Sequence, residues 1–175
     1  MTFDFDRDKV CCFTGHRSLS PEKREAVLPP LRAAVRSLAL DRGYTVFLTG
    51  GAVGFDLLAA GEILSFRERY GGVSLYLLLP FPGYDRRWPE AERELLRRQI
   101  EKADGVLYAS PAYGPGVYHA RDRMLVNFSS VCVSFLEKNA GGTYFTVSYA
   151  YETGVEVISL AKRLTEGYND PGAKA

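Results

Sequence analysis

A histidine and an arginine stand side by side near the start of the chain, directly after an apolar segment. His16 and Arg17 follow the apolar residues 10–14 and Gly15. The planar guanidinium of arginine binds a phosphate or carboxylate through parallel hydrogen bonds. Histidine can donate a hydrogen bond or exchange a proton near neutral pH. The pair predicts an anion-binding corner, the alternative being two surface side chains that pair with neighbouring acids.

Glycines follow a second apolar segment, residues 45–49. Gly50 and Gly51 can let the backbone approach an oxyanion, and the helix predicted to follow adds free amides and a positive dipole end. The spacing matches neither Gly-x-Gly-x-x-Gly nor a Walker A loop, so a tight turn with positive φ explains it equally well. Asp56 falls in the first helical turn, where it can cap the helix or accept a hydrogen bond from a ribose hydroxyl.

Two later segments carry further candidate groups. Gly141-Gly142-Thr143 opens a helix and offers another set of backbone amides. On the preceding helix, Arg123 and Asn127 are one turn apart and share a face. That face can read a base or a sugar if it points inward, and it is only solvated if it points outward. His119, near the start of the same helix, is predicted to have no chemistry.

The rest of the sequence predicts no metal and no nucleophile. Two histidines and scattered cysteines form no metal-ligand spacing, and there is no Gly-x-Ser-x-Gly segment. The stretch from Asp85 to Arg98 is rich in arginine but interleaved with glutamates, which predicts a solvated helix face. Within it, Trp88 could stack on a base.

The elements that must position these groups alternate between strands and helices. Apolar runs of strand length cover residues 10–14, 45–49, 74–79, 105–109, 131–136 and 155–158, and the segments between them have helical spacing. This alternation predicts an α/β, Rossmann-like open sheet of about six mostly parallel strands, with helices on both faces. In such sheets ligands bind beyond the carboxyl ends of the strands, where the strand order reverses.

The chain is predicted to hold a single domain over residues 1–160, followed by a flexible C-terminal tail over residues 161–175. One helix is predicted to begin at Ser20-Pro21, a serine cap followed by proline. Because proline inside a helix removes a backbone hydrogen bond, Pro29-Pro30 predicts that this helix divides into two pieces or kinks.

Composition excludes several classes of protein. Of the 175 residues, 46% are hydrophobic and 25% are charged, which is typical of a globular domain. The 22 basic and 21 acidic residues leave a net charge of +1, which argues against nucleic acid as a partner because a DNA-binding groove needs a basic excess. No apolar run is long enough to span a membrane. The three cysteines lie in apolar runs, which predicts buried thiols and a reducing, cytoplasmic compartment.

Taken together, these segments resemble the YpsA-like branch of the SLOG superfamily, the group that includes DprA/Smf and Lonely-guy proteins. The resemblance covers about residues 9–160. The matching segments are Cys12–Arg17, Thr49–Asp56, Pro80-Phe81, Arg87-Trp88, Tyr113–Gly116, Arg121–Ser130 and Gly141–Thr143 with Thr146. The chain departs from the family pattern at Asp122, where the family has asparagine, and at Asn127, where it has aspartate.

The resemblance implies a Rossmann-like pocket for a nucleotide derivative such as ADP-ribose, NAD or a nucleoside monophosphate. The residues that we predict to bind this ligand are Gly15, His16, Arg17, Gly50, Gly51, Ala52, Gly54, Asp56, Pro80, Phe81, Arg123, Asn127, Gly141, Gly142 and Thr143. By analogy with related folds, an exposed helix face would support a homodimer or a higher homo-oligomer.

Three functions fit this reading, of which a sensor or binding module without turnover ranks first because it needs only the glycine turns and Arg17. The second is hydrolysis of a nucleotide N-glycosidic bond, as in Lonely-guy phosphoribohydrolases. At the late glycine turn those enzymes have a sequence like Pro-Gly-Gly-x-Gly-Thr-x-x-Glu, whose glutamate is an acid that this chain lacks. Thr146 stands at that position here. In this reading Asp56, Asp122 or Glu152 would have to supply the catalytic carboxylate instead. The third function, binding of single-stranded DNA as in DprA, ranks last because the net charge of this chain is only +1.

Overall fold

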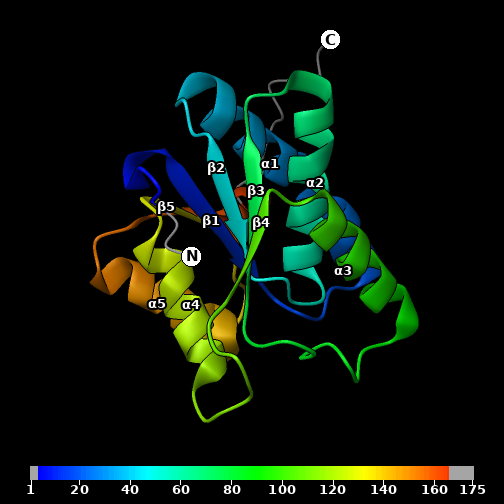
Figure 1. Ribbon diagram of the computed structural model, residues 1–175. Helices are drawn as coiled ribbons and strands as arrows, with labels where there is room; N and C mark the ends of the chain where they lie inside the picture. Colours follow the sequence, from blue (N-terminus) through cyan, green and yellow to red (C-terminus); the bar gives the residue numbers. More distant parts are fainter. Residues whose placement is uncertain (1–3, 166–175) are drawn as a thin grey trace.

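Six parallel strands form one open sheet in the computed structural model, which describes residues 4–165 (Figure 1). The strands are β1 (Val10–Gly15), β2 (Val46–Thr49), β3 (Ser74–Leu79), β4 (Gly105–Tyr108), β5 (Val131–Phe135) and β6 (Glu156–Ser159). The helices are α1 (Pro21–Arg36), α2 (Phe55–Tyr70), α3 (Glu90–Lys102), α4 (Val117–Asn127), α5 (Gly141–Glu152) and α6 (Leu160–Thr165). The predicted α/β class and Rossmann-like parallel sheet are confirmed.

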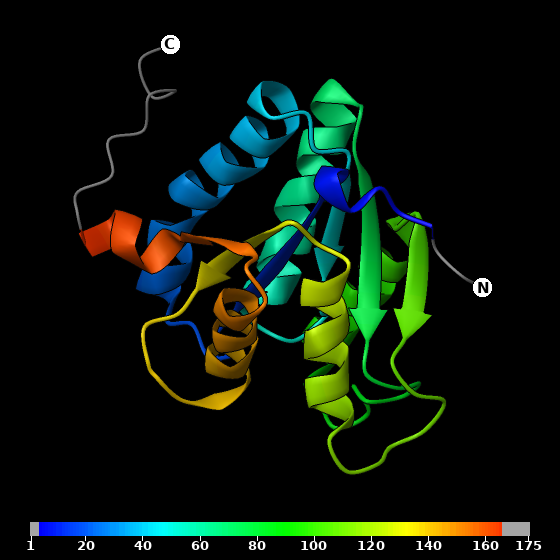
Figure 2. The same cartoon turned by 90° about the vertical axis from the view of Figure 1, so that its left-hand side faces the viewer.

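The hydrophobic core lies on both faces of the sheet, because successive side chains of a strand point to opposite sides. In β1, Cys11 and Phe13 join the core beneath α1, α2 and α6, whereas Val10 and Cys12 join the core beneath α4 and α5. Figure 2 shows α4 and α5 together on one side of the sheet and α1 and α2 on the other. Burial on both faces explains why the central strands read as near-continuous apolar runs.

The strand order determines where a ligand can enter. The strands lie in the order β4-β3-β2-β1-β5-β6, and each neighbouring pair is parallel. From β1 the chain builds outward through β2, β3 and β4, and it then returns to place β5 on the other side of β1. The loops after β1 and β5 therefore lead to opposite faces of the sheet and leave a crevice between them.

Two predictions about the helices are corrected in part: α1 is not divided into two pieces, although a kink at Pro29-Pro30 stays a prediction, and the predicted tail begins with a helix. The helix α1 is continuous through Pro29 and Pro30, because Val27, Leu31 and Val35 on its inner face pack into the core and offset the two missing amide hydrogen bonds. Residues 161–165 belong to α6, which contacts α1, so the first part of the predicted tail is helical. The remainder, residues 166–175, lies outside the described residues. No helix within residues 4–165 is long and apolar enough to cross a membrane.

Candidate functional site

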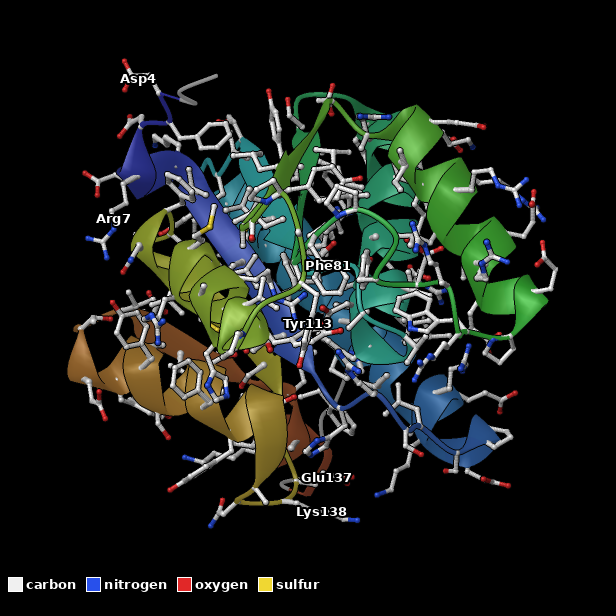
Figure 3. All side chains as sticks on the ribbon, turned by 60° about the horizontal axis from the view of Figure 1, so that its bottom comes forward. Asp4, Arg7, Phe81, Tyr113, Glu137 and Lys138 are labelled. Atoms are coloured by element: carbon white, nitrogen blue, oxygen red, sulfur yellow. The ribbon has the colours of Figure 1, made fainter. Side chains whose placement is uncertain are left out.

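A cleft of about 540 Å³ opens at the carboxyl ends of β1 and β5, the point at which the strand order reverses. Figure 3 looks toward this edge of the molecule, with Phe81 and Tyr113 near its centre and Glu137 and Lys138 on the loop that leads to α5. The lining residues are Thr14, Gly15, His16, Arg17, Ala52, Asp56, Tyr118, His119, Arg121, Asp122, Ala140, Gly141, Gly142 and Thr143. Residues far apart in the sequence thus meet in one cavity.

His16 holds the two sides of the cleft together. Its Nε2 accepts hydrogen bonds from the backbone amides of Glu137, at 2.8 Å, and Lys138, at 3.3 Å. A nitrogen that accepts from amides carries no proton, so the imidazole is neutral, and partial burial lowers its pKa from the usual value. The sequence offered His16 as a donor or an acid–base group; the geometry makes its Nε2 an acceptor that fixes the loop before α5.

Arg17 is an exposed cation on the wall of the cleft. Its Cζ lies 5.5 Å from the ring centroid of Tyr118, a distance suited to a cation–π contact. Among the side chains that the structure describes, residues 4–162, no carboxylate forms an ion pair with the guanidinium, whose charge nevertheless helps to lower the pKa of Asp56. The aromatic ring therefore orients the guanidinium and leaves its hydrogen-bond donors free for an anion.

The start of α5 provides a second set of free donors. The helix begins at Gly141, and no side chain caps it, because the preceding residue is Ala140. The first amides of an α-helix have no partner within the helix and form its positive end. Gly141, Gly142 and Thr143 all line the cleft, so their amides and the guanidinium of Arg17 border the same space.

Two buried carboxylates and a buried arginine form the acidic part of the wall. Arg121 donates from Nε to Oδ1 of Asp122 at 2.7 Å and from Nη1 to the carbonyl oxygen of Gly50. Asp56 accepts a hydrogen bond from the amide of Ala52 at 3.3 Å through Oδ2. Burial raises the pKa of Asp56 to about 6, against the opposing effect of Arg121. The site thus holds a carboxyl group that can change protonation near neutral pH.

The glycines after β2 do not form the open cradle that their sequence suggested. A Cβ at Gly50 would lie 2.7 Å from Oδ2 of Asp56 and still closer to the guanidinium of Arg121. Gly51 has φ +63°, and the Tyr84 hydroxyl donates to its carbonyl oxygen at 2.6 Å. Neither glycine borders the cleft, because protein side chains already fill the space around them. Of this turn, Ala52 and Asp56 reach the cleft wall.

Other predicted ligand-binding residues also lie outside the cleft wall, namely Gly54, Pro80, Phe81, Arg123 and Asn127. Arg123 lies over the ring of Phe145 at 5.8 Å, and Asn127 Oδ1 accepts from the Tyr149 hydroxyl at 2.9 Å. The expected pair on α4 therefore faces α5. It also follows that the two departures from the family pattern lie on different faces of the helix, Asp122 at the cleft and Asn127 against α5.

The cleft includes residues of α4 that the sequence analysis did not assign to ligand binding, although it did offer Asp122 as a candidate catalytic carboxylate. Tyr118, Arg121 and Asp122 lie three and four positions apart, which places them on one helix face. His119 also borders the cleft and stacks on Phe145 at 4.1 Å between ring centroids. Helical spacing could have placed Tyr118, Arg121 and Asp122 on one face. The sequence contains no signal that this face of α4 turns toward the cleft and that the face with Arg123 turns away from it.

A second hollow of about 570 Å³ lies over the outer face of α2, between α1 and α3. It shares Arg17 with the cleft, and its wall includes Leu58, Leu95 and Glu62, of which Glu62 is paired with Arg32. It does not contain the glycine turns after β1 and β5. The cleft is therefore the stronger candidate for ligand binding, although the hollow is slightly larger.

Comparison with known sequences gives a family match. The model of the YspA SLOG family matches residues 12–158. UPF0398 protein OB1025 of Oceanobacillus iheyensis is 28% identical over 116 residues, which are 65% of this chain and 61% of that protein. The uncharacterized SPbeta prophage-derived protein YoqJ of Bacillus subtilis is 20% identical over 135 residues, or 70% of this chain and 79% of that protein. The chain therefore spans less than two thirds of the UPF0398 relative.

Solved structures with the same fold include two DNA processing proteins. DprA from Streptococcus pneumoniae has a TM-score of 0.62 at 21% identity, covering 90% of this chain and 56% of that one. DprA from Helicobacter pylori, for which a single-stranded DNA binding mode is described, has a TM-score of 0.61 at 17% identity, covering 88% and 66%. At these identities the likeness shows the fold alone.

Proposed function

The chain belongs to the YspA SLOG family, and from the geometry of its cleft we propose that it is a binding module for a nucleotide derivative. The ligand class is ADP-ribose, NAD or a nucleoside monophosphate, and the expected role is that of a sensor. One observation carries the proposal: Arg17 lines the cleft together with the uncapped start of α5, and it forms no ion pair with a carboxylate of residues 4–162.

A phosphate group suits the space between Arg17 and Gly141–Thr143. The guanidinium offers forked, charged donors, and the start of α5 offers backbone amides and a positive end. The carboxylate of Asp122 also lies close to the start of α5, because its Oδ2 is 3.7 Å from the position that a Cβ of Gly142 would occupy. The part of the ligand that faces this carboxylate must therefore donate hydrogen bonds and carry no negative charge. A ligand with one anionic end and adjacent hydroxyl donors satisfies both sides, and a ribose phosphate has these groups.

A second candidate, hydrolysis of the N-glycosidic bond of a nucleotide, is favoured by one specific observation. Asp56 has its pKa raised to about 6 by burial, and Asp122 borders the same cleft. A carboxyl group poised near neutral pH beside a second carboxylate is an arrangement used for general acid–base catalysis. The sensor still ranks first because it requires only the groups already free for a ligand.

Calorimetry and thermal unfolding with ADP-ribose, NAD and AMP test the proposal. We expect at least one of them to raise the melting temperature at millimolar or lower concentration, since it binds only the native state. Replacement of Arg17 by alanine should weaken binding by roughly tenfold or more, the value of a hydrogen bond to a charged group. The Arg69→Ala variant is the matched control, because Arg69 lies over the ring of Tyr70 at 5.3 Å and borders neither the cleft nor the hollow over α2.

The same samples separate the candidates. No melting shift and no heat with any of the nucleotides would exclude the sensor. Release of free base, detected by chromatography and lost in Asp56→Asn or Asp122→Asn, would establish the hydrolase instead. An oligothymidylate added in parallel tests single-stranded DNA, and tighter binding of this oligomer than of every mononucleotide would favour the function described for the DprA neighbour.

A further inference from the structure

Three aromatic rings stand in a row beside the mouth of the cleft, and we call Phe81, Tyr113 and Tyr118 the aromatic platform. The ring of Phe81 lies 6.1 Å from that of Tyr118 and 5.6 Å from that of Tyr113, with interplanar angles of 75° and 71°. Tyr118 itself borders the cleft. Figure 3 shows Phe81 and Tyr113 next to each other at the carboxyl edge of the sheet. The platform therefore runs from the cleft wall to the surface.

Tyr113 is the most exposed large apolar side chain among those that the structure describes, residues 4–162, at 72%. Its loop is held at both ends: the Ser110 amide donates to Pro80 at 3.0 Å, and the Val117 amide donates to Gly114 at 3.2 Å. An isolated exposed tyrosine needs no explanation. Here the backbone on both sides is anchored and the ring adjoins two others, so one side of the ring remains open to a ligand while its position is defined.

The platform is connected to the proposed phosphate position. Tyr118 contacts Phe81 and also lies beneath the guanidinium of Arg17, at 5.5 Å from its Cζ. A ligand with an anionic group on Arg17 can therefore extend along the platform without leaving contact with the protein. Aromatic rings bind the flat faces of nucleobases, and this contact tolerates any base because every base has such a face.

We propose that the aromatic platform is a nucleobase-stacking subsite, in which the base of the ligand stacks on the open face of Tyr113 and Phe81 supports that ring from the side, since the two ring planes are inclined at 71°. The inference rests on the proposed function, because it places the phosphate of the same ligand on Arg17. It narrows the ligand to one that carries both a base and a phosphate, and it predicts weak discrimination between bases, since stacking alone reads no hydrogen-bonding edge.

Binding of ADP-ribose and ribose 5-phosphate to matched variants tests the subsite by calorimetry. Replacement of Tyr113 by alanine should weaken ADP-ribose binding by about tenfold, within the range measured for stacked bases, and should leave ribose 5-phosphate binding unchanged. Tyr113→Phe keeps the ring and should bind ADP-ribose like the natural protein. Tyr151→Ala is the control for loss of an exposed ring, because Tyr151 on α5 is 60% exposed and does not border the cleft.

A direct readout of stacking comes from ADP-ribose that carries a fluorescent etheno-adenine. Its emission should change on binding to the natural protein and to Tyr113→Phe, and this change should disappear in Tyr113→Ala. Equal losses for ADP-ribose and ribose 5-phosphate in Tyr113→Ala, or no loss for either, would overturn the subsite. If the natural protein binds neither compound and no other nucleotide, the proposed function itself fails, which is a different result.

Discussion

Asp56 is a buried carboxyl group that its surroundings hold partly in the neutral form. The pKa rises from 3.8 to about 6, mainly through burial. Between about pH 4 and pH 6 the Asp56 carboxyl group therefore keeps its proton in the folded state and loses it in the unfolded chain. As the pH rises through this range, the free energy of unfolding falls. Because a shift of one pKa unit is about 1.36 kcal/mol, the cost above pH 6 is roughly 3 kcal/mol.

Replacement of Asp56 by asparagine removes this ionisation and tests it. The stability of Asp56→Asn relative to the natural protein should rise between pH 4 and pH 7.5, by up to roughly 3 kcal/mol. The measurement is urea unfolding of both proteins at the two pH values. A difference in unfolding free energy that is the same at both values would show that Asp56 is not protonated more readily in the folded state.

At the scale of elements, the turn between β2 and α2 packs against the turn that follows β1. Gly54 directly precedes α2 and has φ +81°, and a Cβ there would lie 2.7 Å from the carbonyl oxygen of His16 and closer still to that of Arg17. This close backbone contact keeps the anion-binding corner in place. It also explains a glycine that the sequence analysis assigned to ligand binding.

A pair of glycine variants separates this contact from backbone strain. Gly54→Ala should lower the free energy of unfolding by more than about 2 kcal/mol, since it combines a positive φ with a clash against rigid backbone. Gly72→Ala shares the positive φ, at +74°, but faces open space, so about 1 kcal/mol is expected. Denaturant unfolding compares the two. Equal losses would mean that strain alone explains Gly54 and that the turns are not tightly packed.

At the scale of the whole molecule, the core of the sheet shields every thiol. Cys11, Cys12 and Cys132 are fully buried and free, and burial raises the pKa of the Cys11 thiol well above its usual value. Only an accessible thiolate reacts quickly. The native protein should therefore show almost no reaction with Ellman's reagent over minutes, and three thiols should appear after unfolding in guanidinium. A thiol that reacts at once in the native protein would contradict the packing of β1 against β5.

Much of the framework was readable because it depends on local pattern. Apolar runs bounded by turns located all six strands, since burial on both faces of a parallel sheet leaves few polar positions. The serine at position 20 and the following proline marked the start of α1. The continuity of α1 through Pro29 and Pro30 could not be read in the same way, because core packing offsets the lost hydrogen bonds.

The sequence by itself determined that Gly15, His16, Arg17 and Gly141–Thr143 follow parallel strands and therefore lie at one edge of the sheet. Only the tertiary structure decided that β5 lies beside β1, which brings these two corners together, and that Arg121 occupies the space at Gly50. The physical reason is the separation along the chain of the residues that interact. Strand and helix patterns are set by neighbours along the chain, whereas strand order and the rotation of α4 depend on packing between distant segments, such as Arg121 and Gly50, that no local pattern records.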